Sequence, residues 1–383
     1  MSVVDDVWPY IPRRRRVLEV LSASEASLIV LLGPPNMTYL TGIRDPTGSL
    51  LISDSCGDAI VTSILDYHRI NAQAPREVDV IAVGREGEES INTDIIPRLY
   101  RGTLAKYLRG EIERCGIKEV YADLKAAPGY LRETLEALKR EGVEVSDASD
   151  ALARVRSIKD DYELELISKA IEISESAFSS LVSNLGSELT EALGAAIIYS
   201  EIMRRGAWSY AFPTIVAFHE NTAYPHHTPT PRKLGPEGPV LIDWGSVYRG
   251  YCSDMTRTFW HGSSTPARFK SLVEAVIEAQ NAALDTAGPG VAAGQVDRAA
   301  RAVLEKMGYS RYFIHGLGHG VGIEVHERPY LRPGSKEVLE PGMVVTVEPG
   351  VYIPGLYGVR IEDMILITRR GARLLTRLSR VIE

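Results

Sequence analysis

Cysteine is scarce in this chain, with three residues among 383 that lie far apart, at Cys56, Cys115 and Cys252. An odd and dispersed set of this kind indicates neither a disulfide framework nor a CxxC metal site. Thiols stay reduced in the cytoplasm, so this scarcity is typical of a cytoplasmic protein. The sequence therefore implies no disulfide framework, and we expect the protein to reside in the cytoplasm.

Long hydrophobic runs and excess positive charge are also absent. No stretch of about 18 apolar residues occurs, and the first residues lack the apolar core of a signal peptide, so we expect neither membrane insertion nor secretion. The 43 basic and 50 acidic residues give a net charge of -7, which offers no support for nucleic-acid binding. The one basic cluster, residues 13–16, is interpreted as a solvated helical turn.

The length of the chain and its pattern of apolar residues predict two domains. A single hydrophobic core rarely serves a chain of 383 residues. Residues 1–150 alternate short apolar runs with helical segments, which indicates a small α/β domain. Residues 151–383 begin with a long amphipathic helix, whose start Asp160 and Glu163 can cap. Further helices are expected at residues 188–205, 266–287 and 296–307, separated by strand-rich, glycine-punctuated stretches.

Two aspartates and two glutamates lie beside apolar, strand-like runs in the second domain. Asp243 ends the run in PVLIDWG, and a turn folds Asp254 of YCSDMTRTF onto a neighbouring strand. Glu348 ends the run in VVTVEPG, and Glu362 precedes the run in RIEDMILIT across a second hairpin. Buried carboxylates need a cation, a metal or a proton. An ion pair with Arg360 is the structural alternative for either glutamate, but one arginine cannot neutralise four acids.

Histidines supply the remaining candidates. His319 lies among glycines in HGLGHGVG, where the backbone can approach a site closely. His326 is too far along an extended segment to bind the same ion, so a substrate or proton-transfer role suits it better. His226 and His227 form a further pair in PHHTP. Carboxylate oxygens with one imidazole suit a pair of divalent ions that would activate a water and polarise a carbonyl.

These motifs resemble those of the X-Pro dipeptidase (prolidase) and aminopeptidase P family of pita-bread metallopeptidases. The resemblance rests on LIDWGSVYRGYCSDMTRTF, HGLGHGVGIEVHE, VVTVEPGVYIP and GVRIEDMILIT, and it extends to RVRSIKDDYELELISKA and NMTYLTG. It implies an α+β fold, with a smaller creatinase-like α/β domain at residues 1–150 and a pita-bread catalytic domain at residues 151–383. It also implies a homodimer.

The resemblance implies a role for each motif residue. The metal ligands would be Asp243, Asp254, His319, Glu348 and Glu362, holding two divalent ions per chain, with Mn or Co preferred and Zn or Fe as alternatives. Asp254 and Glu362 would bridge the ions, and Glu348 would also accept a proton. His226 and His326 would bind the substrate and act in catalysis, and Arg360 would orient a ligand.

The chain departs from the family pattern in two places. Phe218 and His219 replace a small Ser-Gly pair near the expected substrate entrance. Tyr330 stands where dipeptidases of the family often carry an arginine for the substrate carboxylate. We include His219 and Tyr330 among the substrate-binding candidates.

The leading hypothesis is an X-Pro dipeptidase that acts on a small peptide with proline at position two. Aminopeptidase P activity on longer X-Pro peptides stays open because of Tyr330. A metal-dependent hydrolase or lyase of a small non-peptide metabolite stays open because of Phe218 and His219. A non-catalytic peptide-binding module would have lost ligands, and all five are present. No nucleic-acid or membrane partner is expected.

Overall fold

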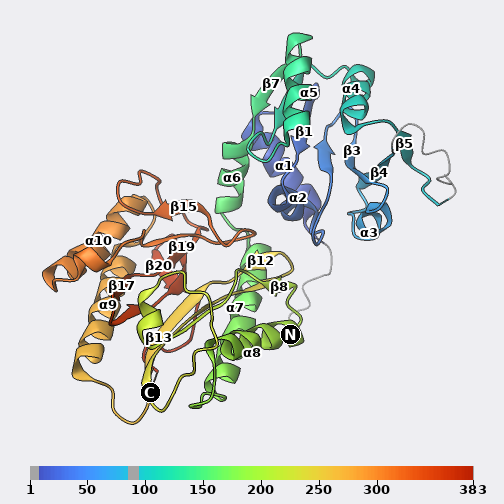
Figure 1. The fold of residues 1–383 in the computed structure, drawn as a ribbon. Helices are drawn as coiled ribbons and strands as arrows, with labels where there is room; N and C mark the ends of the chain where they lie inside the picture. Colours follow the sequence, from blue (N-terminus) through green and yellow to red (C-terminus); the bar gives the residue numbers. More distant parts are fainter. Residues whose placement is uncertain (1–7, 85–94, 383) are drawn as a thin grey trace. The chain divides into compact units, whose positions relative to one another are not determined.

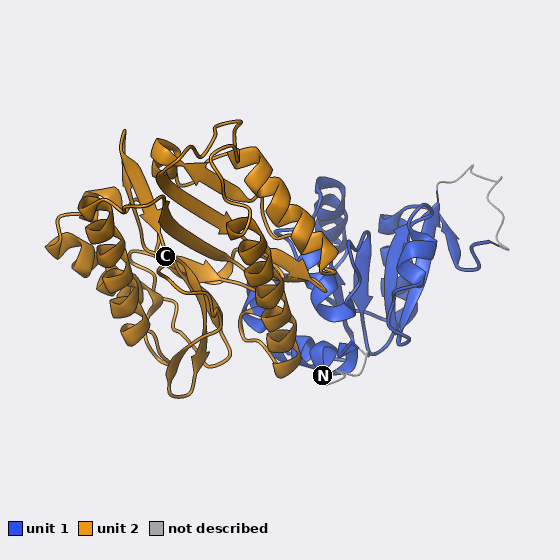
Figure 2. Cartoon of the chain, turned by 90° about the horizontal axis from the view of Figure 1, so that it is seen from below, with its two compact units in different colours: residues 1–156 blue, residues 157–383 orange. Residues whose placement is uncertain are grey.

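The computed structural model describes residues 8–84 and 95–382. The chain divides into two compact units, residues 1–156 and residues 157–383, which Figure 2 distinguishes by colour. The boundary expected from the sequence, between residues 150 and 151, falls inside helix α6 (Ser149–Ser157). Each unit has its own sheets and is described separately.

The first unit is a seven-stranded mixed sheet with helices packed against it (Figure 1). The strands are β1 (Ser27–Leu31), β2 (Ser49–Ile52), β3 (Asp58–Ser63), β4 (Val78–Gly84), β5 (Leu99–Arg101), β6 (Glu119–Ala122) and β7 (Glu144–Asp147), in the order β5-β4-β3-β2-β1-β6-β7. The helices are α1 (Tyr10–Leu21), α2 (Pro34–Thr41), α3 (Tyr67–Asn71), α4 (Leu104–Cys115), α5 (Gly129–Arg140) and α6. The five residues of β1 are all buried, because apolar faces of α4 and α5 share a core with β1 and β6. The predicted α/β pattern is confirmed.

A disulfide links Cys56 to Cys115 in this unit, with their Cα atoms 5.7 Å apart. The cysteine pattern implied no disulfide framework, and it did not predict this single bridge. The two cysteines are 59 positions apart in sequence, and only the packing of α4 on the sheet brings them together. The low cysteine count thus loses its value as an indicator of a reducing compartment.

Four helices surround the sheets of the second unit. They are α7 (Asp161–Val182), α8 (Glu191–Arg204), α9 (Ala267–Thr286) and α10 (Ala293–Lys306), with short 3-10 turns η1 (His219–Ala223) and η2 (Ser310–Tyr312). The predicted cap of the long helix is confirmed: the Asp160 side chain accepts a hydrogen bond from Glu163 N at 2.8 Å, and the Glu163 side chain accepts one from Asp160 N at 2.9 Å. Among the residues that the structure describes, no helix is both long and apolar enough to cross a membrane.

Thirteen strands of the second unit form four sheets. They are β8 (Ser209–Tyr210), β9 (Ile215–Phe218), β10 (Gly238–Trp244), β11 (Ser246–Tyr248), β12 (Tyr251–Cys252), β13 (Met255–His261), β14 (Gly318–Gly320), β15 (Glu327–Leu331), β16 (Val344–Val347), β17 (Gly350–Ile353), β18 (Tyr357–Arg360), β19 (Asp363–Thr368) and β20 (Gly371–Leu374). The sheet orders are β13-β10-β9, β12-β11-β8, β15-β14-β16-β19-β20 and β17-β18.

Two long hairpins dominate these sheets, and both were predicted. In the first hairpin, residues 238–261, β10 pairs with β13 and the chain continues beyond a break into the pair β11–β12. In the second hairpin, residues 344–368, β16 pairs with β19 and the chain continues into the pair β17–β18. Each hairpin thus passes from one sheet into another, and the four acidic candidates lie at these transitions.

Candidate metal centre

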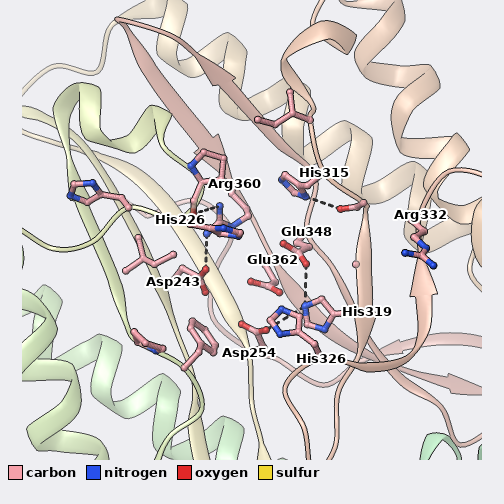
Figure 3. A pocket seen from close by; sticks show the side chains of 18 of the residues that line it. His226, Asp243, Asp254, His315, His319, His326, Arg332, Glu348, Arg360 and Glu362 are labelled. Atoms are coloured by element: carbon pink, nitrogen blue, oxygen red, sulfur yellow. Dashed lines mark hydrogen bonds and ion pairs between the residues drawn. The ribbon is translucent and has the colours of Figure 1, made fainter. Parts of the chain in front are cut away.

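The five candidate ligands converge on one pocket of the second unit (Figure 3). His319 Nε2 lies 3.3 Å from Glu348 Oε1 and 3.6 Å from Asp254 Oδ2. Ligand atoms of Asp254, His319 and Glu362 all lie within 4.8 Å of one another. Asp243 lines the same pocket. A cation placed among these side chains would therefore meet oxygen and imidazole donors from several strands.

The strands explain why the acids point inward. Asp243 is the last residue but one of β10, all of whose residues are buried, and stands opposite Thr256 in the antiparallel register. Glu348 and Glu362 flank the β16–β19 pair, where Val347 stands opposite Asp363. The two hairpins therefore present their acids from facing strand ends.

His319 reaches the acids because β14 lies between β15 and β16 and packs closely against both. A side chain at Gly318 would clash with the Thr346 carbonyl, and one at Gly320 would clash with Arg328. The His319 backbone N–H donates to Thr346 Oγ1 at 3.1 Å, which fixes its position on the strand. The glycines of this motif thus permit β14 to pack closely against its neighbouring strands, whereas the sequence predicted a close approach of the backbone to the site.

Burial and mutual repulsion dominate the electrostatics of the acids. Burial, together with the neighbouring carboxylates, raises the pKa of Asp254 and of Glu362 well above the ordinary values. Burial would also raise the pKa of Glu348, but the hydrogen bond from His319 and nearby positive charges outweigh it and lower this pKa to about 2. The carboxylates therefore outnumber the positive groups at the centre of the site.

Arg360 supplies one cation at the edge of the site. Its Nη2 donates to Asp243 Oδ2 at 2.6 Å, and its Nε donates to Thr256 Oγ1 at 3.0 Å. The Thr256 hydroxyl in turn donates to Glu362 Oε2 at 2.7 Å. Arg360 thus pairs with an aspartate of the first hairpin, whereas the sequence suggested a glutamate of its own hairpin as the partner.

Two buried carboxylate oxygens indicate that the site requires a cation. Among the described residues, Asp243 Oδ1 and Glu362 Oε1 are buried without any hydrogen-bond partner. A buried carboxylate oxygen without a partner is costly, and a divalent cation satisfies it directly. Four carboxylates with one imidazole form a donor set suited to Mn, Co, Fe or Zn. The residues present therefore fit a metal centre.

Four further histidines line the pocket, His226, His227, His315 and His326, and sequence reasoning singled out His226 and His326 for roles. The His326 ring centroid lies 4.1 Å from that of His319, and partial desolvation and the His319 charge lower the pKa of His326 to about 4. His226 lies near enough for its charge to act on His326. His315, which received no role, hydrogen-bonds through Nε2 to the Tyr352 hydroxyl at 3.0 Å.

Tyr352 is a residue of the site to which the sequence analysis assigned no role. Its hydroxyl accepts a hydrogen bond from Arg360 Nη1 at 2.6 Å, so His315, Tyr352, Arg360 and Asp243 form one continuous chain of polar contacts. The only signal in the sequence is the position of Tyr352 four residues after Glu348. That spacing predicts nothing without the bend between β16 and β17.

The position of His219 corrects an expectation from the sequence. It was expected to bind substrate, but it does not line the pocket, and its Nε2 lies 2.7 Å from the carbonyl of Leu234. The residue has a positive φ of 56°, so the chain turns sharply where β9 ends and η1 begins. Phe218 is fully buried in β9. The departures at these two positions lie outside the pocket wall.

Tyr330 does line the pocket, and Arg332 lies beside it. The Arg332 guanidinium lies 5.4 Å from the centroid of the Tyr330 ring, and its side chain is exposed at the pocket. Apolar residues supply much of the remaining wall: Phe212, Pro213, Ile215, Pro225 and Ile314. Sequence reasoning did not consider Arg332.

A deep cluster of carboxylates and one imidazole, in a pocket edged by further histidines, is the donor set of a metal-dependent hydrolase. Residues 165–369 match the model of metallopeptidase family M24, and residues 13–158 match the creatinase/prolidase N-terminal domain. The chain belongs to metallopeptidase family M24. The expected fold, a creatinase-like N-terminal domain followed by a pita-bread catalytic domain, is confirmed.

Several named proteins resemble the chain over more than half of its length. An Xaa-Pro dipeptidase of Pyrococcus horikoshii is 30% identical over 96% of this chain and 97% of the relative. An Xaa-Pro dipeptidase of Pyrococcus furiosus is 40% identical over 62% of this chain and 68% of the relative. The crystal structure of an X-Pro aminopeptidase from Thermotoga maritima MSB8 matches with a TM-score of 0.85 at 27% identity, covering 96% of this chain and 99% of the other.

Proposed function

We propose that the protein is a dinuclear metal-dependent exopeptidase that hydrolyses the X-Pro bond of dipeptides. The observation that carries this proposal is the convergence of Asp243, Asp254, His319, Glu348 and Glu362 in one pocket with two unsatisfied carboxylate oxygens. The relatives named Xaa-Pro dipeptidase support the substrate class.

The chain's own residues divide the chemistry between them. The five ligands would hold two divalent ions, for which we favour Mn or Co, and these ions would activate water and polarise the scissile carbonyl. The Glu348 carboxylate, with its low pKa, is ionised and can accept a proton. His326, with a pKa of about 4, is neutral near pH 7 and can donate a hydrogen bond to the oxygen that gains charge. His226 would protonate the leaving proline nitrogen.

Arg332 supports a dipeptide rather than a longer peptide as the substrate. Among the described residues, no carboxylate pairs with this exposed arginine of the pocket wall. It lies two positions after Tyr330, and residues two apart on an extended segment share a face. The guanidinium could therefore take over the carboxylate contact for which the family arginine is missing at position 330. A bidentate pair with the free carboxylate of proline would favour dipeptides.

A metal-screened assay that compares Leu-Pro, Leu-Pro amide and Leu-Pro-Gly tests the proposal. We expect the fastest turnover with Leu-Pro, and we expect Arg332→Met to raise KM for Leu-Pro by about tenfold or more while leaving the amide unaffected. Arg311→Met is the matched control, because Arg311 also stacks on a tyrosine but lies outside the pocket. No turnover of any X-Pro peptide with any metal would show that the proposal is wrong.

Aminopeptidase P activity is the second candidate, favoured by the likeness to the Thermotoga maritima enzyme. Preference for Leu-Pro-Gly over Leu-Pro in the same assay would establish it. The hypothesis of a small non-peptide metabolite depended on Phe218 and His219, neither of which lines the pocket, so no observation now favours it. A homodimer and a cytoplasmic location stay predictions.

A further inference from the structure

The two histidines that edge the metal centre, His226 and His326, share an unusual situation. Both side chains are open to the pocket, and within the described ranges neither ring hydrogen-bonds to another residue. A ring without a hydrogen bond is free to rotate and shift with its backbone. Something other than hydrogen bonds to the rings must therefore hold these two rings in place.

The residue that follows each histidine supplies the anchor. His227 Nε2 lies 2.8 Å from Glu191 Oε2, and Glu327 Oε1 lies 2.7 Å from Lys159 Nζ. The side chains in both pairs are at most 10% exposed. Two histidines from distant parts of the chain are thus each tethered one residue away, His226 by a buried hydrogen bond between His227 and Glu191 and His326 by a buried ion pair between Glu327 and Lys159.

Of the two anchoring residues, Glu191 makes the larger number of hydrogen bonds. It is fully buried at the first position of α8, and its two oxygens accept five hydrogen bonds from the segment 218–230. The donors are Phe218 N at 2.8 Å, Asn221 Nδ2 at 2.9 Å, His227 Nε2 at 2.8 Å, Thr230 N at 3.0 Å and Thr230 Oγ1 at 2.5 Å. One carboxylate therefore fixes both ends and the middle of the segment that carries His226 into the pocket.

Lys159 performs the corresponding task for His326. Its ammonium group donates to Glu327 Oε1 and to the Ser157 carbonyl at 3.2 Å, in a fully buried position. Glu327 begins β15, directly after His326, so the ion pair fixes the strand where the histidine leaves it. The neighbouring Ile158 forms a β-bridge with Met343, which holds the lysine's own backbone.

We propose that Glu191 and Lys159 are positioning residues, which act on the reaction through His226 and His326 and not through the metal ligands. This inference rests on the proposed function. Buried polar pairs contribute little to net stability, because desolvation offsets their attraction, so a gain in stability does not account for two of them beside the same pocket. Holding a side chain whose ring makes no hydrogen bond does account for them.

Isosteric and charge-removing variants test the first anchor. Glu191→Gln replaces an acceptor with a donor opposite five donors, so we expect kcat to fall about 10- to 100-fold with KM changed much less. Affinity for Mn, titrated into the metal-free protein, should remain unchanged. Glu188→Gln is the matched control, because Glu188 lies three residues earlier in an exposed pair with Lys233. If Glu191→Gln does not fold, His227→Gln tests the same tether from its other side.

Parallel variants test the second anchor. Lys159→Met should lower kcat by a similar factor, whereas Lys159→Arg should retain most activity because it keeps the charge. Lys169→Met serves as control, since Lys169 forms an exposed pair with Glu172. A loss of Mn affinity that matches the loss of kcat would overturn the inference for either anchor, because it would locate the effect at the metal centre.

Double variants provide the sharpest test. If Glu191 acts through His226, then adding Glu191→Gln to His226→Ala should cost nothing further, whereas adding it to His326→Ala should multiply the losses. For Lys159→Met the reverse is expected. Adding it to His326→Ala should cost nothing further, whereas adding it to His226→Ala should multiply the losses. A full additional loss on top of His226→Ala would overturn the proposal, since it would mean that Glu191 supports catalysis by another route.

Hydrogen exchange separates this inference from the proposed function. In the metal-free protein, Glu191→Gln should speed amide exchange in segment 218–230 by about tenfold, because two of its backbone N–H groups donate to Glu191. Exchange elsewhere should stay the same. Unchanged exchange in this segment overturns the positioning role even in an active enzyme. If the parent protein cleaves no X-Pro peptide, the proposed function fails and this measurement still decides the role of Glu191.

Discussion

The two hairpins that present the candidate ligands are built alike but are stabilised differently. Each crosses from one sheet into another, and each carries two acids at the crossing. An aromatic pair joins each to a different helix: Trp244 of the first stacks on Phe178 of α7, and Tyr357 of the second contacts Phe269 of α9 edge-on. The acids of the first are aspartates and those of the second are glutamates.

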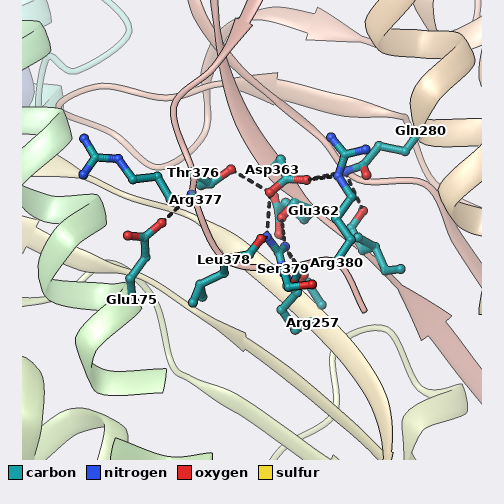
Figure 4. Close-up of polar contacts among 12 residues, drawn as sticks. Glu175, Arg257, Gln280, Glu362, Asp363, Thr376, Arg377, Leu378, Ser379 and Arg380 are labelled. Atoms are coloured by element: carbon teal, nitrogen blue, oxygen red, sulfur yellow. Dashed lines mark hydrogen bonds and ion pairs between the residues drawn. The ribbon is translucent and has the colours of Figure 1, made fainter. Parts of the chain in front are cut away.

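The two hairpins also exchange their cations. Arg360 of the second hairpin pairs with Asp243 of the first, and Arg257 of the first pairs with Asp363 of the second at 2.7 Å. Figure 4 shows Asp363 receiving further hydrogen bonds from Thr376 and Arg380. Neither hairpin neutralises its own acids, so each depends on the other for its geometry.

Arg257 is the strongest of these links. Its five N–H groups serve five acceptors: two on the second hairpin, one on its own strand, and two carbonyls of residues 378 and 379. One acceptor is the backbone carbonyl of Glu362, at 2.5 Å. The orientation of a candidate ligand of the second hairpin is therefore fixed by an arginine of the first.

The largest loss is expected from removing one central acid of either hairpin. Asp254→Asn and Glu362→Gln should each lower kcat/KM by at least about 10³-fold, because metal activation of water is worth several kcal/mol. Steady-state kinetics with metal content measured alongside gives the comparison. A variant of one hairpin that retains more than a tenth of the activity would show that the two hairpins are not equivalent at the centre.

Breaking the link between the hairpins should have the next largest effect, on stability. Arg257→Met leaves the buried Asp363 with one cation fewer, and loss of one partner of a buried pair costs about 3–5 kcal/mol. Urea unfolding followed by the fluorescence of the buried Trp244 measures it. The control is Arg204→Met, because the Arg204 side chain is exposed and its partner Glu201 keeps Arg205 as a second cation, so we expect less than about 1 kcal/mol. Equal effects of the two variants would mean that the hairpins are independent.

A smaller effect, on Mn affinity, is expected from the two threonines whose hydroxyl groups donate hydrogen bonds to the glutamates. Thr256 donates to Glu362 at 2.7 Å, whereas Thr346 donates to Glu348 at a longer 3.3 Å. Thr256→Val should weaken Mn affinity about 10- to 100-fold, and Thr346→Val should weaken it less. Calorimetric titration of the metal-free variants measures both, with Thr286→Val on α9 as a control whose hydroxyl bonds only within its helix. The reverse ranking would contradict the difference between the hairpins.

The sequence predicted these hairpins because their signals are local. Asp243 and Glu348 each end an apolar run, and Asp160 and Glu163 lie three residues apart as a cap requires. The contacts that cross between elements left no local signal. Arg257 with Asp363, Glu191 with His227, and Cys56 with Cys115 join residues 106, 36 and 59 positions apart. The sequence analysis placed His219 in the pocket wrongly, because the positive φ of His219 itself turns the chain at this point.

The smallest predicted effect is a slope of stability against pH, and it tests whether the centre between the hairpins needs a cation. The pKa values of Asp254 and Glu362 are raised in the folded chain by burial and by neighbouring carboxylates. Between the ordinary values near 4 and these raised ones, the folded state binds more protons than the unfolded state, so stability must fall as pH rises.

Glu348 shifts in the opposite direction, to about 2, and therefore contributes only below the ordinary glutamate value of about 4.3. We thus expect the melting temperature of chelator-treated protein to decline from pH 5 upward, and to decline less with Mn present, because the cation keeps the carboxylates ionised. Asp254→Asn should flatten the decline in the metal-free protein. A metal-free protein whose melting temperature rises over the same range would contradict the view that four carboxylates from two hairpins meet without enough positive charge.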